Sequence, residues 1–270
     1  MPLVTAEFIR ATGPTAATVA AMQEWLDKPD AHLDPLVASV YDDAHGDEAD
    51  PAVIEATVDR LVDLADGGAA VEFAIGTGRI AVPLVQRGVP VSGMDVSEPM
   101  LAQLRAKPAS AGIEIVQGDM TTTQVGDDFS LAYLVFNTIM NLRTQDAQVA
   151  CFENAARHLR PGGRFLIECI VPGLASLPPG ERFRPFDVSP EHLGFDEYLD
   201  PVDQILISHH YYVDGDRVRQ SSNAFRYAWP AEFDLMARLA GLELESRHAD
   251  WTGAPFTADS SSHVSVWVKR

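Results

Sequence analysis

A glycine turn at residues 72–79 is the first place in the chain where residue types and spacing point to chemistry. It reads Glu-Phe-Ala-Ile-Gly-Thr-Gly-Arg and continues an apolar run that begins at Ala70. Gly76 and Gly78 allow the backbone to approach a ligand closely, and the start of the next helix offers free N–H groups. Alone, the turn is a weak signal, because a tight strand-to-helix connection needs the same glycines.

Acidic residues after the next two apolar runs strengthen this signal. Asp95 follows the run 89–94, where its carboxylate can accept two hydrogen bonds from a ribose diol. After the run 113–116 come Gly118, Asp119 and Met120; the Asp can accept an exocyclic adenine N–H, and the Met can pack on the base. The purely structural alternatives are a helix-entry carboxylate for Asp95 and a turn residue for Asp119. Together the turns predict a ribose and adenine site.

The elements that must position these residues alternate between strand and helix. Five short apolar runs bounded by turn residues are the expected strands: 70–75, 89–94, 113–116, 131–136 and 164–170. The expected helices cover 53–65, 79–86, the segment capped by Ser97, and 146–159. Strands separated by helices imply right-handed crossovers and a doubly wound, mostly parallel α/β sheet.

The pattern changes after residue 170. Alternating segments at 205–213 and 217–229 flank Asp214-Gly215, the strongest hairpin signal in the chain. A helix from Pro230 and two strands near 242–248 and 263–268 then complete a seven-stranded sheet whose last strand is antiparallel. The expected domains are a helical cap (1–51, with a helix at 15–26), a cofactor-binding core (52–170), an inserted β-hairpin lid (171–229), and a C-terminal helix with the last two core strands (230–270).

Composition narrows the classes of partner. The 270 residues include 20 Lys and Arg against 39 Asp and Glu, and the net charge of −19 disfavours a broad electrostatic grip on nucleic acid. Cys151 and Cys169 lack metal-ligand spacing, so neither a zinc site nor a disulfide framework is expected. No apolar run approaches the ~18 residues of a membrane span, and no signal peptide is evident. We expect a cytoplasmic monomer or homodimer without metal, nucleic-acid or membrane partners.

The motifs resemble those of the class I S-adenosylmethionine-dependent methyltransferases. The matching pieces lie between residues 70 and 169, in the family's order and spacing, at 72–78, 94–97, 118–120 and 158–165. Tyr41 resembles the N-terminal tyrosine that borders the methionine end of the cofactor in this family. One residue departs from the pattern, because Ala74 stands where the family has glycine. The added methyl group carries no charge, and we expect cofactor binding to survive it.

The resemblance implies a Rossmann-like methyltransferase sheet, S-adenosylmethionine as cofactor and S-adenosylhomocysteine as product. Glu72 would help to position the methionine amino group, Asp95 would hold the ribose, and Asp119 with Met120 would form the adenine pocket. The full set of residues implied to bind the cofactor is Tyr41, Glu72, Ala74, Ile75, Gly76, Thr77, Gly78, Arg79, Asp95, Val96, Met100, Gly118, Asp119, Met120, Phe136 and Asn137.

The candidate catalytic residues lie on the acceptor side. Transfer from a sulfonium is an in-line displacement, so holding the acceptor in place can supply ~7–11 kcal/mol of the barrier reduction. Asn137, after the fourth strand, could bond the acceptor or the cofactor, but a turn cap explains it equally well. In the hairpin, His209 and Tyr211 share one face, and Tyr227 lies on the facing strand. Such a layer is more often hydrophobic cover, yet it suits a cationic acceptor through cation–π contact.

Two further resemblances favour an amine acceptor. The inserted layer resembles that of enzymes that N-methylate amino sugars, and residues 235–242 and 255–258 resemble enzymes that N-methylate the terminal amine of modified peptides. We therefore expect methyl transfer to an amine of a small natural product or a short modified peptide, with O-methylation as the alternative. A nicotinamide-dependent oxidoreductase fits G-x-G-x-x-A at 76–81 but gives Glu72 no role. A catalytically silent cofactor-binding partner is the third alternative.

Overall fold

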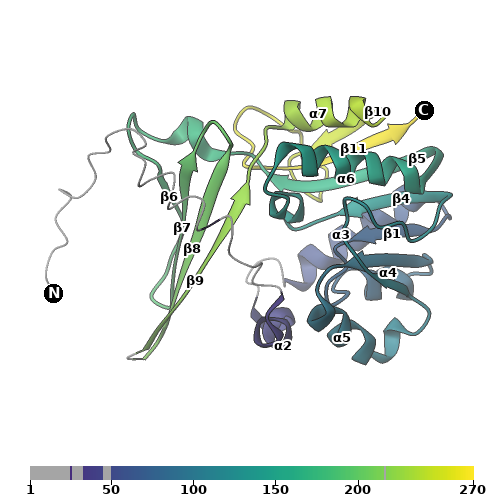
Figure 1. Cartoon of the computed structure of the whole chain (residues 1–270), viewed down its shortest axis with the longest axis horizontal. Coiled ribbons are helices and arrows are strands. Elements are labelled where there is room, and N and C mark those ends of the chain that lie inside the picture. Colours follow the sequence, from purple (N-terminus) through teal and green to yellow (C-terminus); the bar gives the residue numbers. More distant parts are fainter. Residues whose placement is uncertain (1–24, 26–32, 45–49, 216) are drawn as a thin grey trace, which may run out of the picture. The chain divides into compact units, whose positions relative to one another are not determined.

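A computed structural model describes residues 25, 33–44, 50–215 and 217–270 (Figure 1). These residues form two compact units. The larger contains Asp30–Val171 and Ala228–Arg270, and the smaller contains Pro172–Tyr227 together with Trp25. Apart from Trp25, the helix expected at 15–26 lies outside the described residues.

The larger unit is built on a seven-stranded sheet. Its strands, in spatial order, are β10 (Leu242–His248), β11 (Ser262–Lys269), β5 (Leu159–Ile170), β4 (Phe129–Leu134), β1 (Ala70–Phe73), β2 (Val91–Asp95) and β3 (Glu114–Gln117). β11 is antiparallel to both of its neighbours, and the other pairs are parallel. This confirms the predicted doubly wound sheet of seven strands with an antiparallel last strand.

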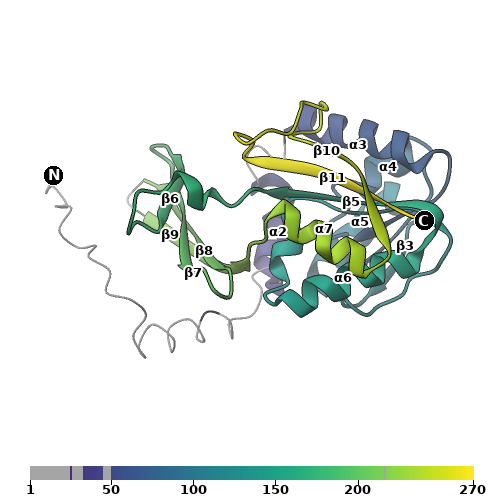
Figure 2. The ribbon, with the colours of Figure 1, turned by 90° about the horizontal axis from the view of Figure 1, so that it is seen from above.

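Helices cover both faces of this sheet. α3 (Pro51–Ala65) and α4 (Ala81–Gln86) lie on one face, and α6 (Gln145–His158) and α7 (Pro230–Leu239) lie side by side on the other (Figure 2). α5 (Glu98–Ala106) shares the buried cluster of α3 and α4, and α2 (Pro35–Ala44) packs on α5. Ser97 caps α5 as predicted, since its Oγ accepts the Met100 N–H at 3.3 Å.

The two faces are packed differently. On the α3 and α4 side, aliphatic residues such as Leu61, Leu84 and Leu104 form one buried cluster with the sheet. On the α6 and α7 side, Phe152 makes ring contacts at 5.1–6.1 Å between centroids with Phe165, Trp267 and Phe233. Aromatic rings bury a large area each, so this cluster fixes α6 and α7 against β5 and β11.

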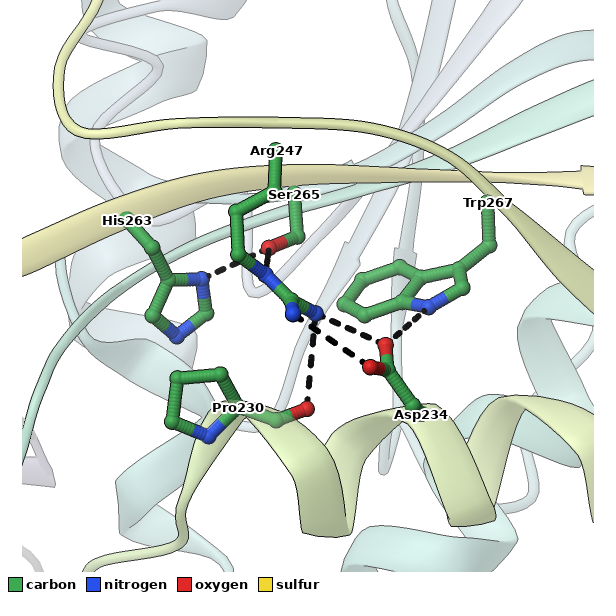
Figure 3. A network of polar contacts seen from close by, with 6 residues as sticks. All are labelled: Pro230, Asp234, Arg247, His263, Ser265 and Trp267. Carbon is green, nitrogen blue, oxygen red and sulfur yellow. Dashed lines mark hydrogen bonds and ion pairs between the residues drawn. The ribbon is translucent and has the colours of Figure 1, made fainter. Parts of the chain in front are cut away.

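A polar network ties α7 to the two C-terminal strands (Figure 3). Arg247 of β10 donates to both carboxylate oxygens of Asp234 on α7, at 2.7 and 3.3 Å, and its Nε donates to Ser265 Oγ at 2.8 Å. The Trp267 indole N–H donates to the same Asp234 carboxylate at 3.0 Å. His263 shares a 2.8 Å hydrogen bond with Ser265, and burial with the nearby Arg247 charge lowers its pKa to about 3, so its ring is neutral.

The smaller unit is a four-stranded antiparallel sheet in the order β6 (Phe183–Val188), β7 (His192–Asp200), β8 (Ile205–Asp214) and β9 (Arg217–Arg226). The predicted hairpin is β8 and β9, so the expectation of a hairpin alone accounts for only half of the sheet. β6 was missed because Pro185 and a register shift beside it interrupt the alternation. β7 was missed because Gly194 and its acidic residues weaken the strand signal.

Short 3-10 turns occupy three of the connections in the described chain. η4 (Pro108–Ser110) follows α5, η5 (Thr138–Asn141) follows β4, and η6 (Gly173–Ser176) begins the smaller unit. Of these, η5 matters most for function, because it leaves the carboxyl edge of the parallel strands, the edge at which open α/β sheets bind ligands.

Candidate active site

The glycine turn predicted to bind a cofactor joins β1 to α4 at the carboxyl edge of the sheet. Ala74, Gly76 and Gly78 have φ values of 55°, 54° and 76°. A Cβ at Gly78 would lie 2.3 Å from a Leu104 methyl carbon, so the Leu104 side chain would have to move, and the φ of 76° also favours glycine there. A Cβ at Gly76 would meet nothing closer than 4.0 Å, so the space beside this residue stays open to a ligand. Ala74 adopts a left-handed conformation that costs an L-residue roughly 1–2 kcal/mol.

Asp95 fixes this turn from the end of β2. One carboxylate oxygen accepts the Gly76 N–H at 2.8 Å, and the other accepts the Ser97 N–H at 2.7 Å. The side chain is mostly buried, with a relative exposure of 9%. Each carboxylate oxygen has more than one acceptor position, so Asp95 can hold the turn and still accept hydrogen bonds from a diol.

Glu72 is the buried acid at the end of β1. Its relative exposure is 4%, and the Tyr133 hydroxyl donates to its Oε2 at 2.9 Å. Burial raises the pKa of Glu72 to about 8, and the nearby Asp95 charge adds to the rise, against the lowering effect of the Tyr133 hydrogen bond. At neutral pH the carboxyl therefore holds a proton, and a cation brought beside it would favour its ionised form.

A pocket lies at the same edge of the larger unit. It is lined by Tyr41, Glu72, Ala74, Ile75, Gly76, Thr77, Arg79, Ile80, Val135, Phe136 and Thr138. The Arg79 guanidinium carbon lies 4.5 Å from the centroid of the Tyr41 ring and 5.4 Å from that of the Phe136 ring. Arg79 thus links α2 to the segment that follows β4, through cation–π contact with both rings.

α2 is attached to the turn by a second polar group. Asp42 accepts hydrogen bonds from the Thr77 hydroxyl at 2.5 Å and from Lys107 Nζ at 2.6 Å. Lys107 Nζ also donates to the Thr77 carbonyl at 2.7 Å. Burial alone would raise the pKa of Asp42, but the hydrogen bonds from Lys107 and Thr77 outweigh it and lower this pKa below its usual value. We call these three residues the α2 clasp.

The pocket brings together half of the predicted cofactor residues. Tyr41, Glu72, Ala74, Ile75, Gly76, Thr77, Arg79 and Phe136 line it, while Gly78, Asp95, Val96, Met100, Gly118, Asp119, Met120 and Asn137 do not. Some of the second group have structural contacts of their own. Asp119 is exposed, and its Oδ1 accepts from both the N–H and the hydroxyl of Thr121, at 2.7 Å each, as a turn residue does. Val96 is 49% exposed, and Met100 is buried in α5.

Three lining residues were missing from the prediction. Ile80, Val135 and Thr138 each adjoin a predicted residue, so their neighbours Arg79, Phe136 and Asn137 were the only signal for them. Lys107 was also missed, because it reaches Thr77 from the end of α5 and no local motif marks it. Contacts between distant segments depend on tertiary geometry, which spacing along the chain does not reveal.

Asn137 has a structural contact at the carboxyl ends of β4 and β5. Asn137 is the residue before η5, with a φ of 58°, and its side chain makes no cap hydrogen bond, so the turn-cap alternative is wrong. Its Oδ1 instead accepts the Ile170 N–H of β5 at 2.7 Å. A direct contact with acceptor or cofactor remains a prediction for its amide group.

The three other candidate catalytic residues lie in the smaller unit. His209 and Tyr211 stack on Phe195 on one face of the sheet, with ring centroids at 4.9 and 6.1 Å. Both His209 ring nitrogens have partners, Ser222 at 2.9 Å and Glu197 at 3.4 Å. Tyr227 is buried against Tyr198 at 5.3 Å between ring centroids. Their catalytic roles stay predictions.

The opposite face of that sheet carries His210 and Tyr212. His192 Nε2 lies 3.1 Å from His210 Nδ1, and the His192 ring stacks on Tyr212 at 4.6 Å between centroids. The other nitrogen of His192 bonds Asp187 at 2.7 Å. As expected, His209 and Tyr211 share one face of β8, and His210 and Tyr212 therefore lie on the other.

The polar groups in the pocket, together with Asp95 beside the same turn, fit a cofactor with a cationic end and a diol. Glu72 offers a buried carboxyl beside the turn, Asp95 offers carboxylate lone pairs, and Gly76 leaves the backbone open to close approach. Over the described part of the chain, no group of three or more His, Cys, Asp or Glu side chains is arranged to hold a metal ion. Among the described helices, none is long and apolar enough to span a membrane.

Comparisons with known proteins identify relatives of this chain. Residues 70–163 match a family described as "Methyltransferase domain". A curated relative, the cypemycin N-terminal methyltransferase of a Streptomyces species, is 27% identical over 207 residues, which cover 76% of this chain and 84% of the relative. The solved structure of the CcbJ methyltransferase from Streptomyces caelestis is 36% identical, with a TM-score of 0.76, and the match covers 87% of this chain and 96% of that one.

A second solved structure has a similar fold at lower identity. CalS10 from Micromonospora echinaspora, an amino pentose methyltransferase solved with S-adenosylmethionine bound, is 18% identical with a TM-score of 0.62. The match covers 88% of this chain and 99% of that chain.

Proposed function

Because the chain belongs to the S-adenosylmethionine-dependent methyltransferases, we propose that it methylates an amine nitrogen of a small natural product or of a short modified peptide. The observation that carries this proposal is the similarity over 76% of the chain to an enzyme named for methylating a peptide N-terminus. The net charge of −19 also favours a cationic over an anionic acceptor. The proposed location is the cytoplasm, and the proposed assembly is a monomer or homodimer.

Each proposed site residue would contact a different part of the cofactor. S-adenosylmethionine supplies an activated methyl group on a sulfonium sulfur. Asp95 would accept from the ribose hydroxyls, Glu72 would pair with the methionine ammonium, and Gly76 would leave room for the backbone of the turn to approach. Tyr41 and Phe136 would close the sides of the pocket, and so exclude water from it.

An amine acceptor must lose a proton before its nitrogen lone pair can attack. Nearby negative charge raises the pKa of an ammonium group and so opposes this loss. Inside the pocket, the methionine ammonium that pairs with Glu72 would balance the charge of that carboxylate, which limits this effect. Proton loss to water before binding is then sufficient, and orientation of the neutral amine supplies most of the rate.

A competition between acceptor classes tests the proposal. Purified protein and S-adenosylmethionine are incubated with peptides that carry a free N-terminal amine, amino sugars, phenols and sugar hydroxyls, and mass spectrometry detects methylated products. We expect product with amines and none with the hydroxyl compounds. An N-acetylated copy of each active peptide is the matched control, and it should give no product. Turnover of phenols or sugar hydroxyls alone would contradict the amine proposal and support the O-methyltransferase alternative.

A further inference from the structure

Two consecutive residues after β4 adopt a left-handed backbone without being glycine. Phe136 has φ 56° and Asn137 has φ 58°. Asparagine tolerates this region, but a bulky aromatic residue is a rare exception there. Such strain persists only where surrounding contacts hold it, and it gathers at functional sites. Here it turns the chain at the wall of the cofactor pocket, because Val135, Phe136 and Thr138 all line that pocket.

Two hydrogen bonds hold the turn to β5. The last residue pair of the β4–β5 ladder is Leu134 with Ile167. Beyond it, the Glu168 side chain accepts the Phe136 N–H at 2.9 Å, and the Asn137 side chain accepts the Ile170 N–H at 2.7 Å. Two side chains, one from β5 and one from the turn after β4, thus replace the backbone ladder where the chain leaves β4.

Glu168 itself is half-buried and does not line the pocket. Burial raises its pKa above the usual range, and the Phe136 N–H and the Trp251 side chain oppose that rise by favouring the ionised form. A buried carboxyl group is costly unless it makes such hydrogen bonds. The hydrogen bond from the Phe136 N–H stabilises the Glu168 carboxylate and at the same time holds the strained turn.

We propose that Glu168 is a positioning residue, which presets the Phe136–Asn137 turn and thereby the wall against which the cofactor is held. It acts through Phe136, whose ring lies under the Arg79 guanidinium at 5.4 Å. This inference rests on the proposed use of the carboxyl-edge pocket for the cofactor, and it holds for any methyl acceptor. A displaced wall would misplace the methyl group, and a misplacement of about 1 Å can cost about 100-fold in rate.

The test compares two substitutions that differ in one property. Glu168→Gln keeps an oxygen that can accept the Phe136 N–H, and Glu168→Leu removes it. Calorimetric titration with S-adenosylmethionine and S-adenosylhomocysteine should show affinity about tenfold weaker for Glu168→Leu, with Glu168→Gln close to wild type. Glu245→Leu is the control, because it also removes a carboxylate, but one that does not line the pocket. This carboxylate pairs with Arg164 at 2.7 Å. It should bind as wild type does.

Two outcomes would overturn the proposal. One is equal affinity in Glu168→Leu and wild type; the other is a loss in Glu168→Gln as large as in Glu168→Leu. If Glu168→Leu does not fold, hydrogen exchange of residues 134–141 in the wild-type protein decides instead. The Phe136 amide should be protected without cofactor, and exchange as fast as an open loop would overturn the proposal. The acceptor competition is independent: turnover of hydroxyl compounds alone would end the amine proposal and leave this inference standing.

Discussion

Two carboxyl groups at the cofactor turn have different environments and therefore different tasks. Asp95 accepts two backbone N–H groups, whereas Glu72 accepts the Tyr133 hydroxyl and holds a proton at neutral pH. The oxygens of Asp95 can also accept hydrogen bonds from a diol. A protonated Glu72 avoids a buried unpaired charge until a cation arrives. The residue types were evident from the sequence, but the protonation of Glu72 follows from its burial, which the sequence does not reveal.

The raised pKa of Glu72 makes stability depend on pH. The folded-state pKa is about 8 against an ordinary 4.5, so between these values the folded protein keeps a proton that the unfolded chain releases. Stability of the cofactor-free protein should therefore fall as pH rises from 5 to 8, by an amount on the order of a few kcal/mol from this group. Urea denaturation at pH 5, 6.5 and 8 measures this slope.

Glu72→Gln separates the contribution of Glu72 to this pH dependence from that of the other carboxylates, because glutamine does not titrate and has nearly the same shape as glutamate. Its stability relative to wild type should increase as pH rises through the same range. Parallel pH profiles for the two proteins would show that Glu72 does not titrate in this window.

Among the elements, α2 depends on polar contacts to an unusual degree. It buries Ala38, but Leu36 and Val40 are 71% and 39% exposed. The α2 clasp and the contact of Arg79 with Tyr41 therefore carry much of its attachment to the larger unit. The stabilisation from apolar burial is proportional to the buried apolar area, and α2 buries little. Loss of one residue of the α2 clasp should therefore weaken the attachment of α2 to the larger unit.

Lys107→Met tests this attachment. Hydrogen exchange in Pro35–Ala44 should become several-fold faster, while exchange in α3 stays unchanged, because the side chain links α2 and the turn and contributes little to the main core. Arg105→Met is the matched control, since it breaks an exposed ion pair with Glu98 on α5. Equal exchange of α2 in wild type and Lys107→Met would show that other contacts hold the helix.

Elements with strong local signals could be predicted, and those without could not. The strands beside the turns at Gly76 and Asp95, and the hairpin around Asp214-Gly215, carry the expected spacing. β6 and β7 do not, because Pro185 and Gly194 weaken their alternation. β7 pairs with β8, and β6 pairs with β7. This sheet pairing determines their conformation, and such tertiary context overrides local propensity.

At the scale of the whole molecule, the chain forms a methyltransferase unit interrupted by a second sheet. The sequence predicted the first unit in detail, since its helices and strands alternate and its turns carry the family's motifs. It predicted only part of the site. Glu72 and Gly76 could be found from their motif, whereas Lys107 and Glu168 make their contacts across long sequence separations and carry no motif.

The most direct test of the whole account is a calorimetric titration of the protein and of Asp95→Ala with S-adenosylmethionine and S-adenosylhomocysteine. The wild-type protein should bind both. Asp95→Ala should bind at least about 100-fold more weakly, because it loses charge-assisted hydrogen bonds to the ribose as well as the contacts that shape the turn. Unchanged affinity in Asp95→Ala would contradict the account, because the cofactor would then be held by residues other than those around the Gly76 turn.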